Sequence, residues 1–267
     1  MQQSVLRPML MKLLRRSALD EEDQQAILSL PSSIKTLDAG NYIVREGEVP
    51  TRCFVLLEGL GYRHKIVING ARQIVGLHFP GDLLNLQSSM LQVADENVQA
   101  LTSVKAAAIP MEALVELIDS RPAIGRAVFS ETLVDASIFR EWIANVGRRD
   151  AQARMAHFLC ELFVRQREIG LARDDRFPLP MTQEQLADVL GLTSVHVNRT
   201  LKALEAAGLI ERDKREVSFA DWAALVSAGD FNPAYLHLGA AEKDDQRPLT
   251  QLERTAPSLG AAGNHGG

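Results

Sequence analysis

The chain has 267 residues, enough for two domains that each bury a substantial core. Its hydrophobic content of 46% and charged content of 24% are typical of a soluble globular protein. The formal net charge of −5 excludes a generally basic surface, so any attraction for DNA has to be local.

Neither membrane association nor a cysteine framework is expected. No apolar run approaches the roughly 18 residues of a membrane span, and the apolar patch in RPMLMKLLRR is interrupted by Lys12 and too short for a signal peptide. We therefore expect a cytoplasmic protein. Cys53 and Cys160 are too few for a disulfide framework or a four-cysteine iron–sulfur set. Both lie among apolar residues, which predicts buried structural thiols.

The first part of the chain is predicted to be a β domain. Residues 17–30 read as a helix with acidic residues in its first turn. From 34 to about 109, short apolar runs alternate with glycine-containing turns, a pattern that indicates antiparallel strands. Asn69-Gly70 predicts a two-residue hairpin turn. We expect residues 1–120 to form a helix followed by a small β sandwich or jelly roll.

A long helix follows the β domain. We expect a short helix over 111–118 and a long one from Pro122 to about Val146, with proline in a first turn that tolerates it. The long helix carries more apolar surface than one face against a barrel needs. We predict that 121–147 is a dimerisation helix; packing within one chain is the alternative. Its predicted interface residues are Val128, Phe139, Trp142, Ile143 and Val146.

After another helix over 150–169 and a charged loop over 170–180, the stretch PMTQEQLADVLGLTSVHVNRTLKALEAAGLI contains two short helices. Thr182 and Gln185 form a capping box at the start of the first helix. Gly191 ends that helix, because glycine adopts positive φ without steric cost. A second helix after such a turn is typical of the helix-turn-helix motif, in which it lies in the major groove of DNA.

The second of these helices has an apolar and a polar face. Helical spacing predicts three inward-facing residues, Val197, Leu201 and Leu204. The opposite face then carries Arg199 and Lys202 and no acid, and it can donate to phosphates and base edges. An ordinary helical hairpin at the edge of a core is the alternative. Cations and acids nearly balance over 148–216, which argues against a strong local field.

The segment after the second helix favours DNA binding. LIER, a turn at DKR, and EVSF predict a β-hairpin. A helix-turn-helix beside a hairpin is a winged helix, with Lys214 and Arg215 at the wing tip. We assign 148–232 to this domain. We predict that the tail, 233–267, is disordered, because most of it is polar, rich in Gly and Ala, and without periodicity.

Roles in DNA binding follow from side-chain chemistry. We expect Arg199 to bind guanine with its guanidinium fork, Asn198 to pair with adenine, and Ser194 and His196 to contact phosphate. The full set of predicted DNA-binding residues is Thr182, Gln183, Ser194, Val195, His196, Asn198, Arg199, Lys202, Lys214 and Arg215.

The order of these parts resembles the Crp–Fnr family of bacterial transcription regulators. The resemblance rests on LDAGNYIVREGE, FVLLEG, HFPGD and the helix-turn-helix stretch, and it covers about residues 17–231. It implies an α+β protein with an N-terminal cyclic-nucleotide-binding-like β jelly roll, a long dimerisation helix and a C-terminal winged helix-turn-helix. It also implies a homodimer that binds a palindromic operator in double-stranded DNA and acts on RNA polymerase.

The chain departs from the cyclic-nucleotide-binding members, which carry Gly-Glu and, further on, Arg-Ser or Arg-Thr. Here Gly81, Asp82 and Leu83 form the predicted effector pocket, and Ala94-Asp95-Glu96-Asn97 stands where the Arg belongs. Two carboxylates there would repel a phosphate. We therefore expect no cyclic AMP bound in the usual way, and any small-molecule effector is of another, unidentified kind.

Two further departures concern the branch and the operator. The N-terminus lacks the cysteines of the oxygen-sensing branch, yet VQALTSVKAAAI is more similar to that branch and its cysteine-free relatives. Val195 stands where family members often place Glu, while Arg199 keeps the Arg position. The half-site therefore cannot be copied from the better-known members.

Two other function classes have less support. A cupin-like metal enzyme needs two histidines and a Glu on barrel strands, and His64 and His78 come without that motif. The sequence also shows no nucleophile elbow and no phosphate loop. We expect no enzyme activity, no metal and no cofactor. A small-molecule-binding module that controls a protein partner is the third class, and it requires the basic face of the second helix to be incidental.

Overall fold

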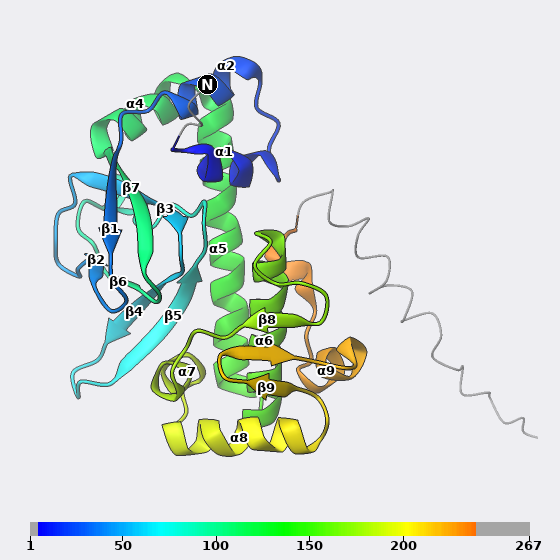
Figure 1. The fold of residues 1–267 in the computed structure, drawn as a ribbon. Coiled ribbons are helices and arrows are strands. Elements are labelled where there is room, and N and C mark those ends of the chain that lie inside the picture. The colour runs from blue at the N-terminus through cyan, green and yellow to red at the C-terminus, as the bar shows by residue number, and fades with distance from the viewer. Residues whose placement is uncertain (1–4, 239–267) are drawn as a thin grey trace, which may run out of the picture.

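A computed structural model describes residues 5–238. Two β-sheets lie on one side of the long helix α5 (Pro122–Arg148). A smaller, mainly helical domain packs around the C-terminal half of the same helix (Figure 1). Among the described residues no helix is both long and apolar enough to cross a membrane.

Two short helices precede the sheets. Helix α1 (Arg7–Leu14) buries Met9, Leu10 and Leu13 against the barrel and the long helix. Helix α2 (Glu21–Leu28) begins after Asp20, whose carboxylate accepts from the backbone N–H of Asp23. Helix α2 was predicted from the sequence, whereas α1 was not.

The β domain has the predicted two-sheet architecture. One sheet has the strand order β1-β7-β3, the other β2-β6-β4-β5, and all pairings are antiparallel. Its elements are β1 (Ser33–Leu37), β2 (Tyr42–Val44), β3 (Arg52–Glu58), β4 (Gly61–Ile66), β5 (Arg72–His78), α3 (Ser88–Leu91), β6 (Asn97–Ala100) and β7 (Val104–Pro110). Side chains such as Val44, Leu56 and Val98 fill the core of the domain.

The hairpin between β4 and β5 differs from the expected two-residue turn. Its loop runs over residues 67–71, and the Val67 N–H donates to the Ala71 carbonyl oxygen at 3.0 Å. Gly70 adopts a φ of +83°, whereas Asn69 keeps a negative φ. A two-residue type I′ turn needs positive φ at both central residues, so Asn69-Gly70 does not form one. The dipeptide predicted the position of the loop correctly, but the loop is longer than two residues.

Helix α4 (Met111–Ser120) and the long helix α5 (Pro122–Arg148) follow the barrel. The first half of α5 packs Ile124, Ala127 and Val128 into the core that includes α1 and α4. Its second half packs Val134, Ile138 and Trp142 into the core of the C-terminal domain. One helix therefore belongs to both domains.

The C-terminal domain has the predicted winged-helix order with one more strand. Its elements are α6 (Ala151–Glu168), β8 (Arg176–Pro178), α7 (Gln183–Leu190), α8 (Ser194–Ala206), β9 (Glu211–Asp213), β10 (Glu216–Ser218) and α9 (Trp222–Ala228). Strand β8, expected as loop, pairs with β10 and completes a three-stranded sheet. The Phe163 ring of α6 packs edge-on against both Phe177 of β8 and Phe219.

The predicted boundary at residue 233 between the DNA-binding domain and a disordered tail is wrong for the first residues of that tail. Pro233–Leu236 form the 3₁₀ helix η1, and Leu236 is buried. The Tyr235 hydroxyl donates to the Glu161 carboxylate at 2.8 Å, which fixes η1 against α6. A predominantly polar composition concealed these few anchoring residues. The rest of the predicted tail, 239–267, lies outside the described residues.

Candidate nucleic-acid interface and sensor pocket

The helix-turn-helix is held by caps at each boundary. The Thr182 hydroxyl accepts from the Gln185 N–H at 3.1 Å, and the Gln185 side chain accepts from the Thr182 N–H at 2.9 Å. Gly191 at the end of α7 has a φ of +62°, which glycine adopts without strain. The Thr193 hydroxyl then caps α8 by accepting from the His196 N–H. The predicted capping box is confirmed.

Helix α8 lies at the end of the molecule farthest from α1 and α2 (Figure 1). Its inward stripe is the predicted one, with Val197, Leu201 and Leu204 buried. On the opposite side Val195 is 82% exposed, and Arg199 and Lys202 are also exposed. Because these three positions lie at spacings of four and three, they form one stripe that faces solvent.

The other residues assigned to DNA binding surround this stripe. Ser194, His196 and Asn198 are half-buried along the flanks of α8. Thr182 and Gln183 are exposed at the start of α7. Lys214 and Arg215 are exposed at the wing tip, where Lys214 adopts a positive φ of 54°. The predicted DNA-binding residues on α8, at the start of α7 and at the wing tip thus all lie on one domain.

The electrostatics of α8 are more favourable than the residue count suggests. Glu205 near its end makes two hydrogen bonds of 2.9 Å with the Arg212 guanidinium. Arg212 also lowers the pKa of the Glu205 carboxyl through these bonds. This acid is already neutralised within the domain, so Arg199 and Lys202 dominate the exposed stripe.

The contacts between this motif and the barrel were not predicted from the sequence. The Arg72 guanidinium of β5 donates to the Asp188 carboxylate of α7 at 2.6 Å. The Gln73 side-chain amide donates to the Val189 carbonyl oxygen at 3.1 Å. Helix α7 is thereby tied to the β4–β5 hairpin. No local sequence signal distinguishes these surface-type residues from solvated ones.

The predicted effector pocket at Gly81, Asp82 and Leu83 is covered by α1. A Cβ atom at Gly81 would lie 2.8 Å from the Pro8 carbonyl oxygen, so α1 can approach this closely only over glycine. Lys12 of α1 contacts the Asp82 carboxylate at 2.6 Å. These contacts hold the pKa of Asp82 far below its usual range. Asp82 is thus an anchor for α1.

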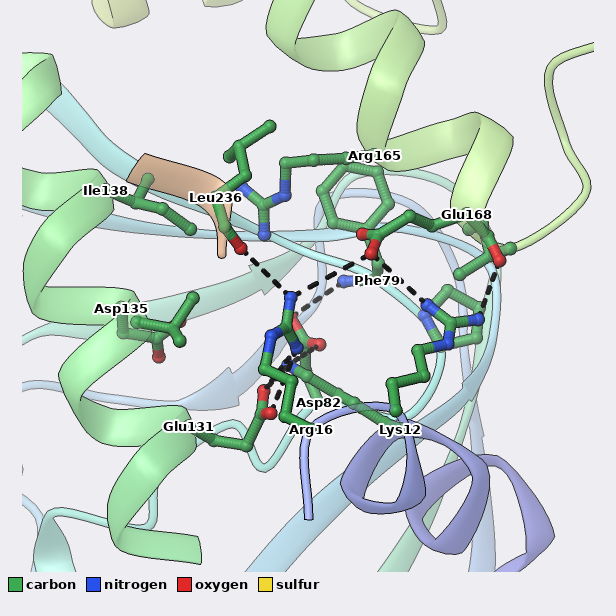
Figure 2. A pocket seen from close by; sticks show the side chains of 14 residues that line it. Lys12, Arg16, Phe79, Asp82, Glu131, Asp135, Ile138, Arg165, Glu168 and Leu236 are labelled. Carbon is green, nitrogen blue, oxygen red and sulfur yellow. Dashed lines mark hydrogen bonds and ion pairs between the residues drawn. The ribbon is translucent and has the colours of Figure 1, made fainter. Parts of the chain in front are cut away.

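An ion-pair network continues from Asp82 toward the C-terminal domain. Lys12 also contacts Glu131 of α5 at 3.1 Å, and Arg16 contacts the same carboxylate at 3.0 Å. Figure 2 shows Arg16 between Glu131 and Leu236, whose carbonyl oxygen accepts from it at 3.0 Å. These side chains line a cavity of about 40 Å³, which has room for water rather than a nucleotide.

Glu96 does not present the bare negative charge that was expected from the sequence. Glu96 lies 3.4 Å from the Arg63 guanidinium and is buried. The Asp95 carbonyl oxygen accepts from Lys65. The cation that pairs with Glu96 comes from β4, a strand remote from it in sequence. Of the two carboxylates, only the exposed Asp95 is left to repel a phosphate, and Arg63 itself occupies the space nearby.

The predicted dimer residues on α5 face in several directions. Val128 and Trp142 are buried inside their own chain, and the Trp142 indole N–H donates to Glu161 at 2.9 Å. Phe139 is half-buried beside Arg63, and Val146 is half-buried close to Gly191. Ile143 is 73% exposed. The assignment of Val128 and Trp142 to a second subunit is therefore corrected, because their apolar surface is covered by α1, α4 and α6.

Both cysteines are buried, as expected. Burial raises the pKa of the Cys53 thiol to about 12 and also raises that of Cys160. Neither thiol is poised for redox chemistry. Among the described residues, no group of three or more His, Cys, Asp or Glu side chains is arranged to hold a metal ion.

Together, a two-sheet barrel, a shared long helix and an exposed recognition-type helix define a winged-helix DNA-binding regulator. Two family models match the chain, the cyclic nucleotide-binding domain over residues 34–121 and the Crp-like helix-turn-helix domain over residues 153–228. FixK, a nitrogen fixation regulation protein of Bradyrhizobium diazoefficiens, is 33% identical over 174 residues, 64% of this chain and 71% of that protein.

A second relative and a solved structure point to the same family. The transcriptional activator protein FnrL of Cereibacter sphaeroides is 27% identical over 79% of this chain and 86% of its own length. The structure of FixK2 from Bradyrhizobium japonicum matches with a TM-score of 0.68 at 23% identity, over 74% of this chain and 98% of that one. The chain belongs to the Crp–Fnr family, in its Fnr/FixK-like branch, and is a transcription regulator with a helix-turn-helix DNA-binding domain.

Proposed function

We propose that the protein acts as a homodimer on a palindromic operator, with α8 of each subunit in the major groove. The observation that carries this proposal is the solvent-facing stripe of Val195, Arg199 and Lys202 on a doubly capped helix-turn-helix. A buried helical hairpin has no need of such a stripe. Two α8 helices related by a twofold axis would meet half-sites one DNA turn, about 34 Å, apart.

Within each half-site the side chains divide into base readers and phosphate contacts. Arg199 is exposed one turn into α8, where its fork matches guanine O6 and N7. Asn198 on its flank suits adenine. Ser194 and His196 in the first turn, and Thr182 and Gln183 at the start of α7, suit phosphates. Lys202, Lys214 and Arg215 add positive charge along the backbone.

The dimer contact is proposed for a stripe of α5 that the described chain leaves exposed. Phe129, Leu133 and Ile143 are 62%, 54% and 73% exposed. With Ala136 and Arg140 between them, they follow spacings of four, three, four and three along α5. This alternation is the pattern of a two-helix seam, in which each residue packs against the partner helix. Large apolar side chains at such spacing favour a second copy of α5.

RNA polymerase is the proposed protein partner. FnrL is named a transcriptional activator, and activation requires contact with the transcription machinery. At the tip of the β4–β5 hairpin three consecutive apolar residues, Ile66, Val67 and Ile68, are each at least half exposed. The hairpin packs against α7, so its tip lies close to the DNA-binding motif. We propose it as a polymerase contact.

One experiment tests the function as a whole. Purified protein selects duplexes from a random pool, and the bound sequences are determined. We expect a palindrome whose half-site centres are separated by about one helical turn, bound by two chains in sedimentation. A module that acts only on a protein partner would enrich no sequence, and that outcome would exclude the proposal.

A further inference from the structure

One large apolar side chain lies alone on the solvent-facing stripe of α8. Val195 is 82% exposed, and among the described residues only Ile68, at the tip of the β4–β5 hairpin, is a more exposed large apolar residue. Arg199 and Lys202 follow Val195 on the same stripe, at spacings of four and three. Both sequence neighbours of the valine are polar. Val195 is therefore an isolated apolar group within a polar surface.

The stability of α8 does not account for a valine at this position. Val195 is the second helical residue after the cap at Thr193, and the first turn holds no acidic residue. An acid is favoured there, because the free N–H groups at a helix start carry partial positive charge. The branched side chain of valine also has a lower helix propensity than alanine. Because the side chain is exposed as well, its role lies in a contact that the free chain does not make.

The major groove of DNA offers such a side chain one matching group. Guanine, adenine and cytosine present hydrogen-bond donors and acceptors at their edges, whereas thymine adds a C5-methyl group beside its O4 acceptor. Valine neither donates nor accepts, so against the other three bases it would cover polar atoms without pairing them, which costs free energy. Against thymine, its two methyl groups can bury the C5-methyl. The stiff χ1 of a β-branched side chain means that little freedom is lost in this contact.

We propose that Val195 is a specificity-determining residue that recognises the C5-methyl group of a thymine in each half-site. This inference rests on the proposed DNA-binding function and adds a second base to what α8 recognises. Val195 and Arg199 lie about 6 Å apart along the helix axis, whereas stacked base pairs are about 3.4 Å apart. The thymine therefore lies one or two base pairs from the guanine that Arg199 binds.

The first test removes only the methyl group from the DNA. In the duplex that the wild-type protein selects, each thymine of the half-sites is replaced in turn by deoxyuridine, which pairs with adenine in the same way but lacks the C5-methyl. We expect one position in each half-site where the affinity of the wild-type protein falls about fourfold, and about fifteenfold when both half-sites are changed, because about one buried methyl group is lost per half-site. Replacement of the other thymines should change little.

The second test removes the methyl groups from the protein. We expect Val195→Ser to bind the thymine duplex and the deoxyuridine duplex equally tightly. Its stability in urea should equal that of the wild type, because Val195 is exposed and serine has a similar helix propensity. The matched control is Val49→Ser, which changes a valine that is 67% exposed in the loop between β2 and β3. That variant should keep the full response to deoxyuridine.

Several results would overturn the inference while leaving the proposed function intact. The wild-type protein could bind every deoxyuridine duplex as tightly as the selected one, or Val195→Ser could keep the wild-type response, which would assign the methyl group to another side chain. A marked loss of stability in Val195→Ser would show that the valine packs within the fold instead. If the wild-type protein selects no sequence from the random pool, the proposed DNA-binding function itself fails.

Discussion

The Arg72 guanidinium donates to the Asp188 carboxylate at 2.6 Å and thereby joins the β4–β5 hairpin to the first helix of the helix-turn-helix. Both side chains are mostly buried, with 27% and 17% of their surfaces exposed. Arg72 also lies over the Tyr62 ring, 5.8 Å from its centroid. With the Gln73 bond to Val189, this ion pair is a direct polar link through which a change in the barrel would reach α7 without passing along α5.

Breaking this link should loosen the helix-turn-helix. We expect Arg72→Ala and Asp188→Ala each to weaken operator binding several-fold while the selected sequence stays the same, because neither residue faces the DNA. In a double-mutant cycle for urea unfolding the pair should show a coupling energy of about 1 kcal/mol. Additive effects in that cycle would mean that the ion pair does not hold the domains together.

A charged residue on the exposed stripe of α5 should dissociate the dimer. Leu133→Glu and Ile143→Glu each place a carboxylate against its own symmetry mate in the proposed seam, with no partner to neutralise it. Sedimentation should show monomers with far-ultraviolet circular dichroism unchanged, and operator affinity should fall sharply.

Gln25→Glu is the control for that prediction, since Gln25 is also exposed on a helix but lies on α2, outside the stripe. It should remain dimeric. If all three variants sediment as dimers, the subunits associate through another surface.

The stability of the fold should decrease in mild acid because of His78. Burial lowers the pKa of its ring from 6.5 to about 4, with the nearby Arg63 charge contributing. Between these values the unfolded chain binds a proton that the folded chain does not, so stability is lost as pH falls from 6.5 toward 4. At pH 5 this one histidine costs about 2 kcal/mol relative to pH 7.

His78→Gln should remove that share of the pH dependence, measured by urea unfolding at pH 5 and pH 7. His64 and His157, whose pKa values are also lowered by burial, keep the rest. Between pH 7 and 8 the stabilities of the two proteins should change in parallel, because His78 is then mainly neutral in both the folded and the unfolded chain. An identical slope between pH 5 and 7 in the variant would show that His78 is solvated.

Elements whose signals are local were predictable from the sequence. The capping box at Thr182, the glycine at 191 and the apolar spacing of Val197 and Leu201 all act within a few residues, so their structural outcome follows from the sequence around them. The same holds for the alternation of strands and glycine turns in the barrel.

Features that depend on distant partners were not predictable. Lys12 meets Asp82 across 70 positions, and Arg72 meets Asp188 across 116. Trp142 was predicted to lie in the dimer interface because its spacing along α5 matched that of the other apolar residues. Spacing along one helix cannot show that α6 covers the side chain. Charged residues such as Arg63 read as solvated until the fold brings their partners together.

The most specific prediction concerns two exposed cations on α8. Arg199→Ala should lose preference for one base pair in each half-site, worth about 1–3 kcal/mol of discrimination, while its affinity for unrelated sequence stays nearly intact. Lys202→Ala should weaken binding to every sequence and flatten the salt dependence of binding, because it removes a phosphate contact. Both measurements use the selected duplex, the same duplex with one pair changed, and a scrambled one, over a salt series. If Arg199→Ala weakens all three duplexes equally and Lys202→Ala relaxes the sequence preference, α8 is rotated in the groove and Lys202 is the base reader.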